Sequence, residues 1–339
     1  MSPSAISDLP PEAVAWLRVI GFVPRSWEKL AGDVSPRRYY RLHAKGGDTA
    51  IIALYPPSLE DACVHFRATT GLLEEAGVSV PKILAGDCDR GLMLLEDVGN
   101  ETLYDLRSHG WRKLEPWLVS AVELSGRIAG IESEKVAGLN PPLDGALLSR
   151  ELEQTWEAVL APTGLDPQSG PGLALKAALD DVVAALAAAP RIPCHRDFMA
   201  RNLVPRSDGG LVVLDHQDLR LGPPGYDLAS LTNDSFFPPP QMRARLLSAV
   251  GSEGPSRDEI ERAAIQRTFK AIGTYATFAR RGSTRHLPLI KPTLERGLEL
   301  LQKHFNSLPL PALRQGLRSW LSPTDRASAT LSPRAPDSP

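Results

Sequence analysis

The sequence predicts an α+β fold whose N-terminal part is rich in β-strands and whose C-terminal part is mainly helical. Short alternating segments bounded by glycine and proline run through residues 22–98, whereas apolar residues at helical spacing dominate after Gly99. The chain has 339 residues, about twice the ~150 of a typical domain, which favours two lobes or one large domain. We therefore assign 1–98 to an N-lobe, 99–321 to a C-lobe and 322–339 to a disordered tail rich in proline and serine.

The composition excludes several classes of protein. Hydrophobic residues make up 42% of the chain and charged residues 23%, and the formal net charge is -2 at pH 7. This balance suits a globular chain with enough apolar surface for a core, and it excludes a collagen-like or wholly disordered protein. A nucleic-acid binder would carry a basic surplus, and no run approaches the ~18 apolar residues of a membrane span. We expect no nucleic acid, no membrane and no obligate protein partner.

The N-terminus and the cysteines favour a cytoplasmic location. The first residues lack the cationic and apolar regions of a secretory signal. The three cysteines, Cys63, Cys88 and Cys194, show no CxxC spacing and leave one unpaired in any disulfide scheme. We therefore expect reduced thiols in the cytoplasm.

In the N-terminal part, helical spacing marks residues 12–20 and a longer segment that ends at Gly77. Ser58 and Asp61 form a capping-box pattern at the start of the longer helix, whose apolar face includes Phe66. Strand patterns mark the segments 27–30, 39–42, 49–55, 80–84 and 91–96.

In the C-terminal part, Ser256 and Glu259 form a second capping-box pattern at the start of a long helix. Two short strands are expected at 203–205 and 211–214, beside the most polar residues of the chain. Helical spacing marks the segments 112–131, 146–160, 172–189, 241–250, 257–280 and 291–305.

The strongest chemical signal is an H-R-D-x-x-x-x-N loop that runs from His195 to Asn202 and is followed by Asp215 at the end of an apolar strand. This is the spacing of phosphotransferases with a kinase fold. Asp197 would orient an acceptor hydroxyl and take its proton, and the oxygens of Asn202 and Asp215 would hold Mg²⁺. The alternative is a polar loop in which His195 and Asp197 only satisfy backbone groups.

Beyond this loop, the chain resembles the aminoglycoside phosphotransferase-like kinases, which include choline kinases. Within them it is similar to bacterial kinases that phosphorylate the anomeric hydroxyl of N-acetylmuramate and N-acetylglucosamine. The matching stretches span nearly the whole chain before the tail. They are GDVSPRRYYRL (32–42), ALYPPSLEDACVHF (53–66), GLMLLEDVG (91–99), LLSRELEQTW (147–156), CHRDFMARNLV (194–204), VLDHQDLRLGPPGYDLASL (213–231) and QRTFKAIGTYATFARR (266–281).

The resemblance implies a bilobal protein-kinase-like fold with ATP between the lobes. Residues 32–41 would cover the phosphates, with the Ser35 hydroxyl near them, and the backbone from Glu96 to Val98 would bind adenine. The alternatives are an ordinary turn at Ser35 and a solvated strand end at Glu96.

One departure from the kinase pattern concerns the phosphates. Many kinases hold the α- and β-phosphates with a lysine on the third strand, paired to a glutamate on the next helix. Here the strand, residues 50–55, has no lysine, although Glu60 remains as a helix carboxylate. We expect Arg37, Arg38 or Arg41 to supply the charge, unless these arginines form a solvated basic face.

On the substrate side, the resemblance implies less. Gln217 and Asp218 would face sugar hydroxyls, and Arg201 would meet an anion or the γ-phosphate. Glu153 either lines the cleft or lies exposed on its helix. Asp227, with His195, would brace the catalytic loop without touching substrate.

Three functions follow. The first is an ATP-dependent amino-sugar kinase that makes a sugar 1-phosphate in peptidoglycan recycling. The second is an aminoglycoside kinase or another small-molecule hydroxyl kinase, and the third is a non-catalytic nucleotide-binding regulator, suggested by the missing lysine. Between Arg262 and Leu294 the chain has seven Lys or Arg residues and no Asp or Glu. This charge favours an anionic or neutral sugar over a polycationic drug, if these side chains face the site.

Overall fold

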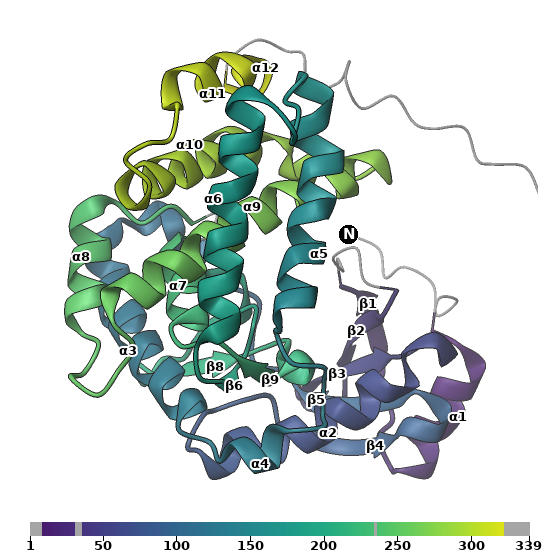
Figure 1. Ribbon diagram of the computed structural model, residues 1–339. Helices are drawn as coiled ribbons and strands as arrows, with labels where there is room; N and C mark the ends of the chain where they lie inside the picture. The colour runs from purple at the N-terminus through teal and green to yellow at the C-terminus, as the bar shows by residue number, and fades with distance from the viewer. Residues whose placement is uncertain (1–8, 31–35, 234–235, 322–339) are drawn as a thin grey trace, which may run out of the picture. The chain divides into compact units, whose positions relative to one another are not determined.

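The computed structural model describes residues 9–30, 36–233 and 236–321 of the chain, which divides into two compact units (Figure 1). The first unit comprises the residues up to 109 together with 201–219, and the second comprises 110–200 together with the residues from 220 onward. The division falls inside the expected catalytic loop, between Ala200 and Arg201. The lobe boundary at residue 98 stays a prediction, and the expected tail lies outside the described residues.

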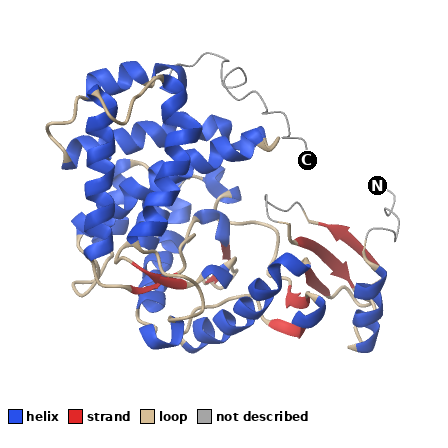
Figure 2. Cartoon of the chain, turned by 45° about the vertical axis from the view of Figure 1, so that its right-hand side comes forward, coloured by secondary structure: helices blue, strands red, loops and turns tan. Residues whose placement is uncertain are grey.

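The first unit is built on a five-stranded antiparallel sheet with the strand order β1-β2-β3-β5-β4 (Figure 2). Together with the helical second unit, this sheet confirms the α+β class expected from the sequence. The elements of this unit are α1 (Pro11–Val19), β1 (Ser26–Lys29), β2 (Arg38–His43), β3 (Thr49–Leu54), α2 (Glu60–Glu75), β4 (Ile83–Asp87), β5 (Leu92–Glu96), β7 (Leu203–Pro205) and β8 (Leu211–Val213).

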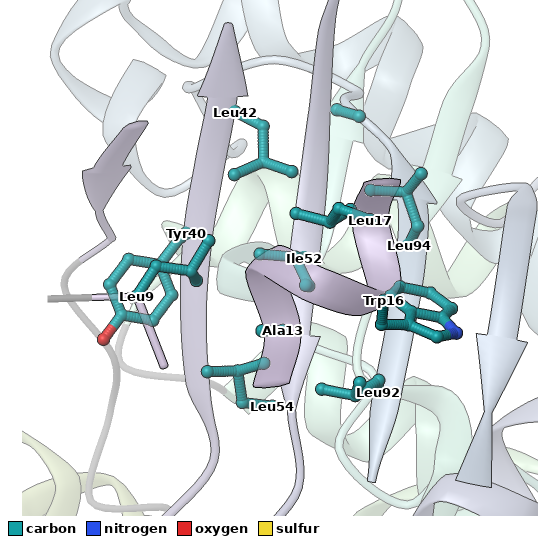
Figure 3. Packing of buried hydrophobic residues seen from close by; sticks show 11 residues of the cluster. Leu9, Ala13, Trp16, Leu17, Tyr40, Leu42, Ile52, Leu54, Leu92 and Leu94 are labelled. Carbon is teal, nitrogen blue, oxygen red and sulfur yellow. The ribbon is translucent and has the colours of Figure 1, made fainter. Parts of the chain in front are cut away.

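Alternation along β3 and β5 gives the sheet two apolar faces, since successive side chains point to opposite sides. Figure 3 shows the cluster on the face covered by α1, where Trp16 and Leu17 lie among strand residues that include Ile52 and Leu94. The other face carries a second cluster in which Phe66 of α2 packs with its strand neighbours. Each fully buried leucine or isoleucine contributes roughly 1.5–3 kcal/mol, so both helices are fixed to the sheet.

Two local predictions for this unit are wrong. Ser58 does not cap α2, because a 3₁₀ turn over Pro57–Leu59 precedes the helix and Leu59 occupies the N-cap without a side-chain bond. The thiols of Cys63 and Cys88 form a disulfide, with 5.6 Å between their Cα atoms, whereas the buried Cys194 is free. The packing of α2 beside the turn after β4 brings this pair together, and sequence spacing does not reveal it.

Residues 201–219 join the first unit through a β7–β8 hairpin. The Leu103 amide donates to the Leu203 carbonyl, and the Val213 amide donates to the Ser79 carbonyl. The 3₁₀ turn His216–Asp218 then lies against α2. Asn202 and Asp215, the two expected metal ligands, therefore lie on a segment that is hydrogen-bonded to the rest of the first unit.

The second unit is helical, and its centre is α9, which packs against α5, α6, α7 and α10 (Figure 1). The Ser256–Glu259 capping box is present at its start, as the sequence predicts. Gly273 lets α5 approach closely, because a Cβ there would lie 2.8 Å from the Thr155 Cα. The elements are α3 (Trp111–Ala129), α4 (Ser133–Val136), α5 (Gly145–Thr155), α6 (Gly170–Ala188), β6 (Ile192–Cys194), β9 (Arg220–Gly222), α7 (Tyr226–Asn233), α8 (Pro240–Ser248), α9 (Arg257–Arg280), α10 (Leu287–His304), α11 (Leu310–Gly316) and α12 (Arg318–Leu321).

No pattern in the sequence predicts β6 and β9, which pair antiparallel at the start of the expected catalytic loop. Among the described residues, no helix has both the length and the apolar character needed to cross a membrane.

Candidate active site

A cavity of about 350 Å³ lies within the first unit. It is bordered by β2, by the segment after β5 and by the ends of the β7–β8 hairpin. Six of the residues that the sequence predicts for the site line it together: Arg37, Arg41, Glu96, Val98, Asn202 and Asp215.

Two other residues were expected at the nucleotide, Ser35 and Arg38. Ser35 lies outside the described residues. Arg38 is exposed at the start of β2 and does not line the cavity. Of the two adjacent arginines, only Arg37 therefore reaches the site.

Asp215 has an unusual backbone conformation for a non-glycine residue, with φ 59° and ψ 39° in the left-handed region. Such conformations cluster at functional sites, where the surrounding structure maintains them. The Asp215 carboxylate accepts a hydrogen bond from Arg37 at 2.8 Å and one from the Gln217 amide at 3.0 Å. Its side chain is 40% exposed, so it also remains open to a ligand.

The donor set at this cavity fits Mg²⁺. Asn202 and Asp215 offer an amide oxygen and a carboxylate, and Mg²⁺ in kinases takes one or two such ligands with phosphate oxygens and water completing the set. The described residues contain no cluster of three or more His, Cys, Asp or Glu side chains suited to a metal. A metal here would therefore depend on oxygens from a bound nucleotide.

The segment after β5 is held by ion pairs. Arg41 binds Asp97 through two hydrogen bonds, of 2.6 and 2.9 Å. Burial alone would raise the pKa of Asp97, but the bonds from Arg41 hold it below its usual range. Glu96 pairs with Arg206 at 3.4 Å and accepts a bond from the Lys82 amide. The backbone expected to face adenine is thus fixed on both sides.

Three of the expected substrate residues also belong to the first unit. Gln217 is buried and bonded to Asp215, and Asp218 lies half-buried on the same 3₁₀ turn. The Arg201 guanidinium lies 3.4 Å from the centre of the Tyr104 ring. That stacking fixes the cation through an aromatic face.

Asp197 belongs to the second unit, where it faces two cations of α9. Its Oδ1 lies 3.3 Å from Arg267 Nη2 and 3.6 Å from Lys270 Nζ. Glu151 of α5 lies 3.6 Å from the same Lys270 nitrogen and 3.0 Å from Arg196. Three cations therefore surround two carboxylates. We call these five residues the acceptor cluster.

Two further side chains, those of Tyr226 and Gln266, are connected to the acceptor cluster by hydrogen bonds. The Tyr226 hydroxyl donates to Gln266 at 3.1 Å, and the Gln266 amide donates to Glu151 at 2.9 Å. Arg267 also lies over the Tyr226 ring and donates to the Arg196 carbonyl. Tyr226, Gln266 and Glu151 are buried, and the side chains of Arg196 and Arg267 are 20% and 10% exposed, so the network fixes the position of each charge.

The cations decide the protonation state of Asp197. Burial alone would raise the pKa of Asp197, but Lys270, Arg267 and Arg196 together lower it well below its ordinary value. The carboxylate is therefore ionised throughout the physiological range. It can accept and orient a hydroxyl hydrogen, but it is a weak base.

Asp227 holds the backbone of the loop that carries Asp197. Its carboxylate accepts hydrogen bonds from the amides of His195, at 2.7 Å, and Arg196, at 2.9 Å. Arg196 has φ 77°, so the loop turns through a conformation that needs such support. Burial raises the pKa of Asp227, opposed by His195 and the two amides.

Of the two alternatives given above for Glu153 on α5, the structure shows the second, since this side chain is exposed. The buried carboxylate is Glu151, two residues earlier. Arg267 and Lys270 belong to the basic stretch between Arg262 and Leu294, and the sequence analysis did not select them individually. Their spacing of three residues, which puts them on one face of a helix, is the sequence signal that could have identified them.

Comparison with known proteins places this arrangement in a family. The model of the phosphotransferase enzyme family matches residues 26–262, which cover both units. The chain belongs to this family. The resemblance drawn from the motifs is confirmed, and the protein is a kinase-type phosphotransferase.

Curated relatives of this phosphotransferase are about a third identical to it over the aligned residues. An N-acetylmuramate/N-acetylglucosamine kinase of Pseudomonas aeruginosa is 33% identical over 291 residues, covering 78% of this chain and 83% of that protein. A kinase of the same description from Caulobacter vibrioides is 30% identical over 299 residues, with 76% and 80% covered.

Solved structures share the fold of this phosphotransferase at low sequence identity. The choline kinase LicA from Streptococcus pneumoniae has a TM-score of 0.60 at 17% identity, with 86% of this chain and 97% of that chain covered. A GDP complex of aminoglycoside 2'-phosphotransferase-IIIa has a TM-score of 0.59 at 14% identity, with 87% and 98% covered. LicA has also been solved with AMP.

Proposed function

We propose that this phosphotransferase transfers the γ-phosphate of ATP to the anomeric hydroxyl of N-acetylmuramate or N-acetylglucosamine, giving the sugar 1-phosphate. The observation that carries the proposal is the acceptor cluster, in which Asp197 is held ionised among cations suited to an anionic sugar. The curated relatives, which are described as kinases of these two sugars, support the same assignment.

The donor half of the proposed reaction uses the first unit. The cavity between β2 and the hairpin receives the nucleotide, with the backbone of Glu96 to Val98 facing adenine. Asn202 and Asp215 would hold Mg²⁺, which neutralises phosphate charge when it is bound. Gln217 orients the Asp215 carboxylate through its 3.0 Å hydrogen bond.

The acceptor half uses the second unit. Asp197 accepts a hydrogen bond from the sugar hydroxyl and aims its oxygen, while Asp227 and the loop backbone keep Asp197 in place. A loose phosphoryl-transfer transition state asks little of a base, because the proton leaves late. An anomeric hydroxyl is more acidic than an ordinary sugar alcohol, so a weakly basic carboxylate suffices.

The charge of the acceptor cluster bears on the choice of sugar. N-acetylmuramate carries a lactyl carboxylate, and N-acetylglucosamine does not. Lys270 and Arg267 would attract that carboxylate, each charge-assisted hydrogen bond contributing ~1.5–3 kcal/mol. A polycationic aminoglycoside would meet repulsion from the same side chains. We therefore favour the sugar over the drug as acceptor.

We further propose that the reaction takes place in the cytoplasm and serves peptidoglycan recycling. ATP is available there, and the sugar 1-phosphate is a form that nucleotidyl transfer can use. A disulfide such as Cys63–Cys88 is rare in that compartment. The redox state of this pair inside the cell therefore tests the location.

Phosphorus NMR with proton coupling tests the function. With ATP, Mg²⁺ and N-acetylmuramate, we expect a product whose phosphorus couples to the single anomeric proton, together with loss of the reducing end. Coupling to two protons would place the phosphate on C6, and turnover of aminoglycosides alone would favour the drug-kinase alternative. Absence of turnover with every acceptor, despite nucleotide binding, would support a regulator.

A further inference from the structure

The phosphates of the proposed nucleotide need a positive charge that the third strand does not supply. In β3 the sequence reads Thr-Ala-Ile-Ile-Ala-Leu, so the lysine of many kinases is absent. Residues 31–35, which lie outside the described chain, also contain no lysine or arginine. Among the described residues that line the cavity, the cations are Arg37 and Arg41.

Arg41 is already committed to another carboxylate. Its Nε and Nη2 atoms bind the two oxygens of Asp97, and Nη2 also donates to the Gly99 carbonyl at 3.2 Å. The side chains of Arg41 and Asp97 are 9% and 7% exposed. A buried bidentate pair of this kind is costly to break, because each charge would be left without its partner. Arg41 therefore fixes the segment after β5 and does not serve the phosphates.

Arg37 differs in what it binds. Its Nη2 donates to Asp215 at 2.8 Å, and its own side chain is 11% exposed. The guanidinium also lies 5.8 Å from the centre of the Tyr39 ring. Its carboxylate partner is the proposed metal ligand, 40% exposed at the edge of the cavity. This pair is therefore open to exchange, unlike the pair of Arg41.

We infer that Arg37 is the phosphate-binding cation of this kinase and that it changes partner when nucleotide binds. In the nucleotide-free protein, Arg37 neutralises Asp215. When Asp215 is engaged by a divalent cation that accompanies the nucleotide, two cations compete for one carboxylate, and the guanidinium turns to the phosphate oxygens. Arginine suits this task because its planar fork binds carboxylate and phosphate alike. The inference rests on the proposed function only in requiring a nucleotide.

The test compares Arg37→Gln with Arg38→Gln, a matched control because Arg38 is adjacent, of the same type and exposed. Calorimetry measures binding of adenosine, ADP and ATP, with and without Mg²⁺. For Arg37→Gln we expect ATP with Mg²⁺ to bind about 10- to 100-fold more weakly, while adenosine binds as in the parent protein. Arg38→Gln should change neither affinity, and Arg37→Lys should recover part of the loss.

A second measurement tests the exchange itself without any nucleotide. Free Mn²⁺ is counted by electron paramagnetic resonance in the presence of the protein alone. Because Arg37 competes for Asp215, Arg37→Gln should bind Mn²⁺ several-fold more tightly than the parent protein does, and Asp215→Asn should remove this gain.

Unchanged ATP affinity in Arg37→Gln would overturn the inference, as would an equal loss for adenosine and ATP. Mn²⁺ affinity that is the same in Arg37→Gln and the parent protein would overturn the exchange of partners. None of these readouts needs a phosphorylated sugar. The sugar-kinase proposal can therefore fail while the assignment of Arg37 holds, and the reverse is also true.

Discussion

Replacing Lys270 with methionine is the sharpest test of how the acceptor cluster selects its sugar. Lys270 Nζ lies 3.6 Å from both Asp197 and Glu151, and the side chain is 16% exposed. At an effective dielectric constant of about 20, each pair is worth roughly 4–5 kcal/mol of gross Coulomb energy. Arg196 and Arg267 remain in the variant, and removal of lysine also removes its desolvation penalty, so the net loss is far smaller. For this net loss we use the ~1.5–3 kcal/mol that one charge-assisted hydrogen bond contributes.

That free energy corresponds to a fall of about 10- to 150-fold in kcat/KM for N-acetylmuramate. N-acetylglucosamine lacks the lactyl carboxylate, so its kcat/KM should fall only by the part that comes from the changed surroundings of Asp197. The ratio of the two kcat/KM values, measured by coupled ADP release, should therefore fall about tenfold. Lys270→Arg should restore most of it.

Arg281→Gln is the control, because Arg281 is an exposed cation just after the same helix. It should leave the ratio unchanged. Burial lowers the pKa of Lys270, opposed by Asp197 and Glu151. The preference for N-acetylmuramate should consequently decline with rising pH sooner than an exposed lysine would predict. Equal losses for both sugars in Lys270→Met would refute the reasoning, because Lys270 would then act only through Asp197.

Three other outcomes are expected. Asp197→Asn should lower kcat by about 10²–10⁴ with ATP affinity unchanged in calorimetry, and near-native turnover would contradict its role. Burial would raise the pKa of Glu261, but Lys303 and its other cationic partners lower it to about 2. The ionised Glu261 carboxylate stabilises the folded protein fully above the pKa that it has in the unfolded chain, and this effect is lost as the pH falls toward 2. Glu261→Gln should therefore lower the free energy of unfolding in urea by about 1–2 kcal/mol at pH 7, after allowance for solvent screening, and by progressively less below pH 4. Reduction of Cys63–Cys88, 25 residues apart, should destabilise the protein by about 3–4 kcal/mol; three alkylatable thiols in unreduced, denatured protein would show that no disulfide forms.

Long, patterned elements of the fold are predictable from the sequence because their signals are local. The strand alternation over 49–55 and the capping box at Ser256 each encode an element within a few residues, and both match the structure. The strands β6 and β9 have three residues each and exist only because they pair with each other. No periodicity can reveal them. The Ser58 cap fails for a related reason, since a proline-led 3₁₀ turn takes over the start of α2.

The residues of the candidate site also divide into those that local spacing predicts and those that depend on tertiary contacts. Asp197, Asn202 and Asp215 were selected because the chemistry fixes their spacing along one stretch of chain. The choice between Glu151 and Glu153 depends on how α5 is rotated, and that rotation follows from its close approach to α9 at Gly273. A tertiary contact more than a hundred residues away therefore decides which carboxylate is buried.

The charges of the two proposed reactive carboxylates, Asp197 and Asp215, are neutralised in different ways, and the difference matches their tasks. Asp197, whose side chain is 29% exposed, is surrounded by cations that α9 and the loop hold in a mostly buried network, so its charge and direction are fixed before an acceptor arrives. Asp215 is countered by one arginine at the open edge of a cavity. A carboxylate that must orient a hydroxyl benefits from permanent partners, because movement would misdirect the attack. One that must accept a metal with each nucleotide needs a partner that can leave. Substitution of Arg37 should therefore appear in the KM for ATP, and substitution of Lys270 in the KM for the sugar.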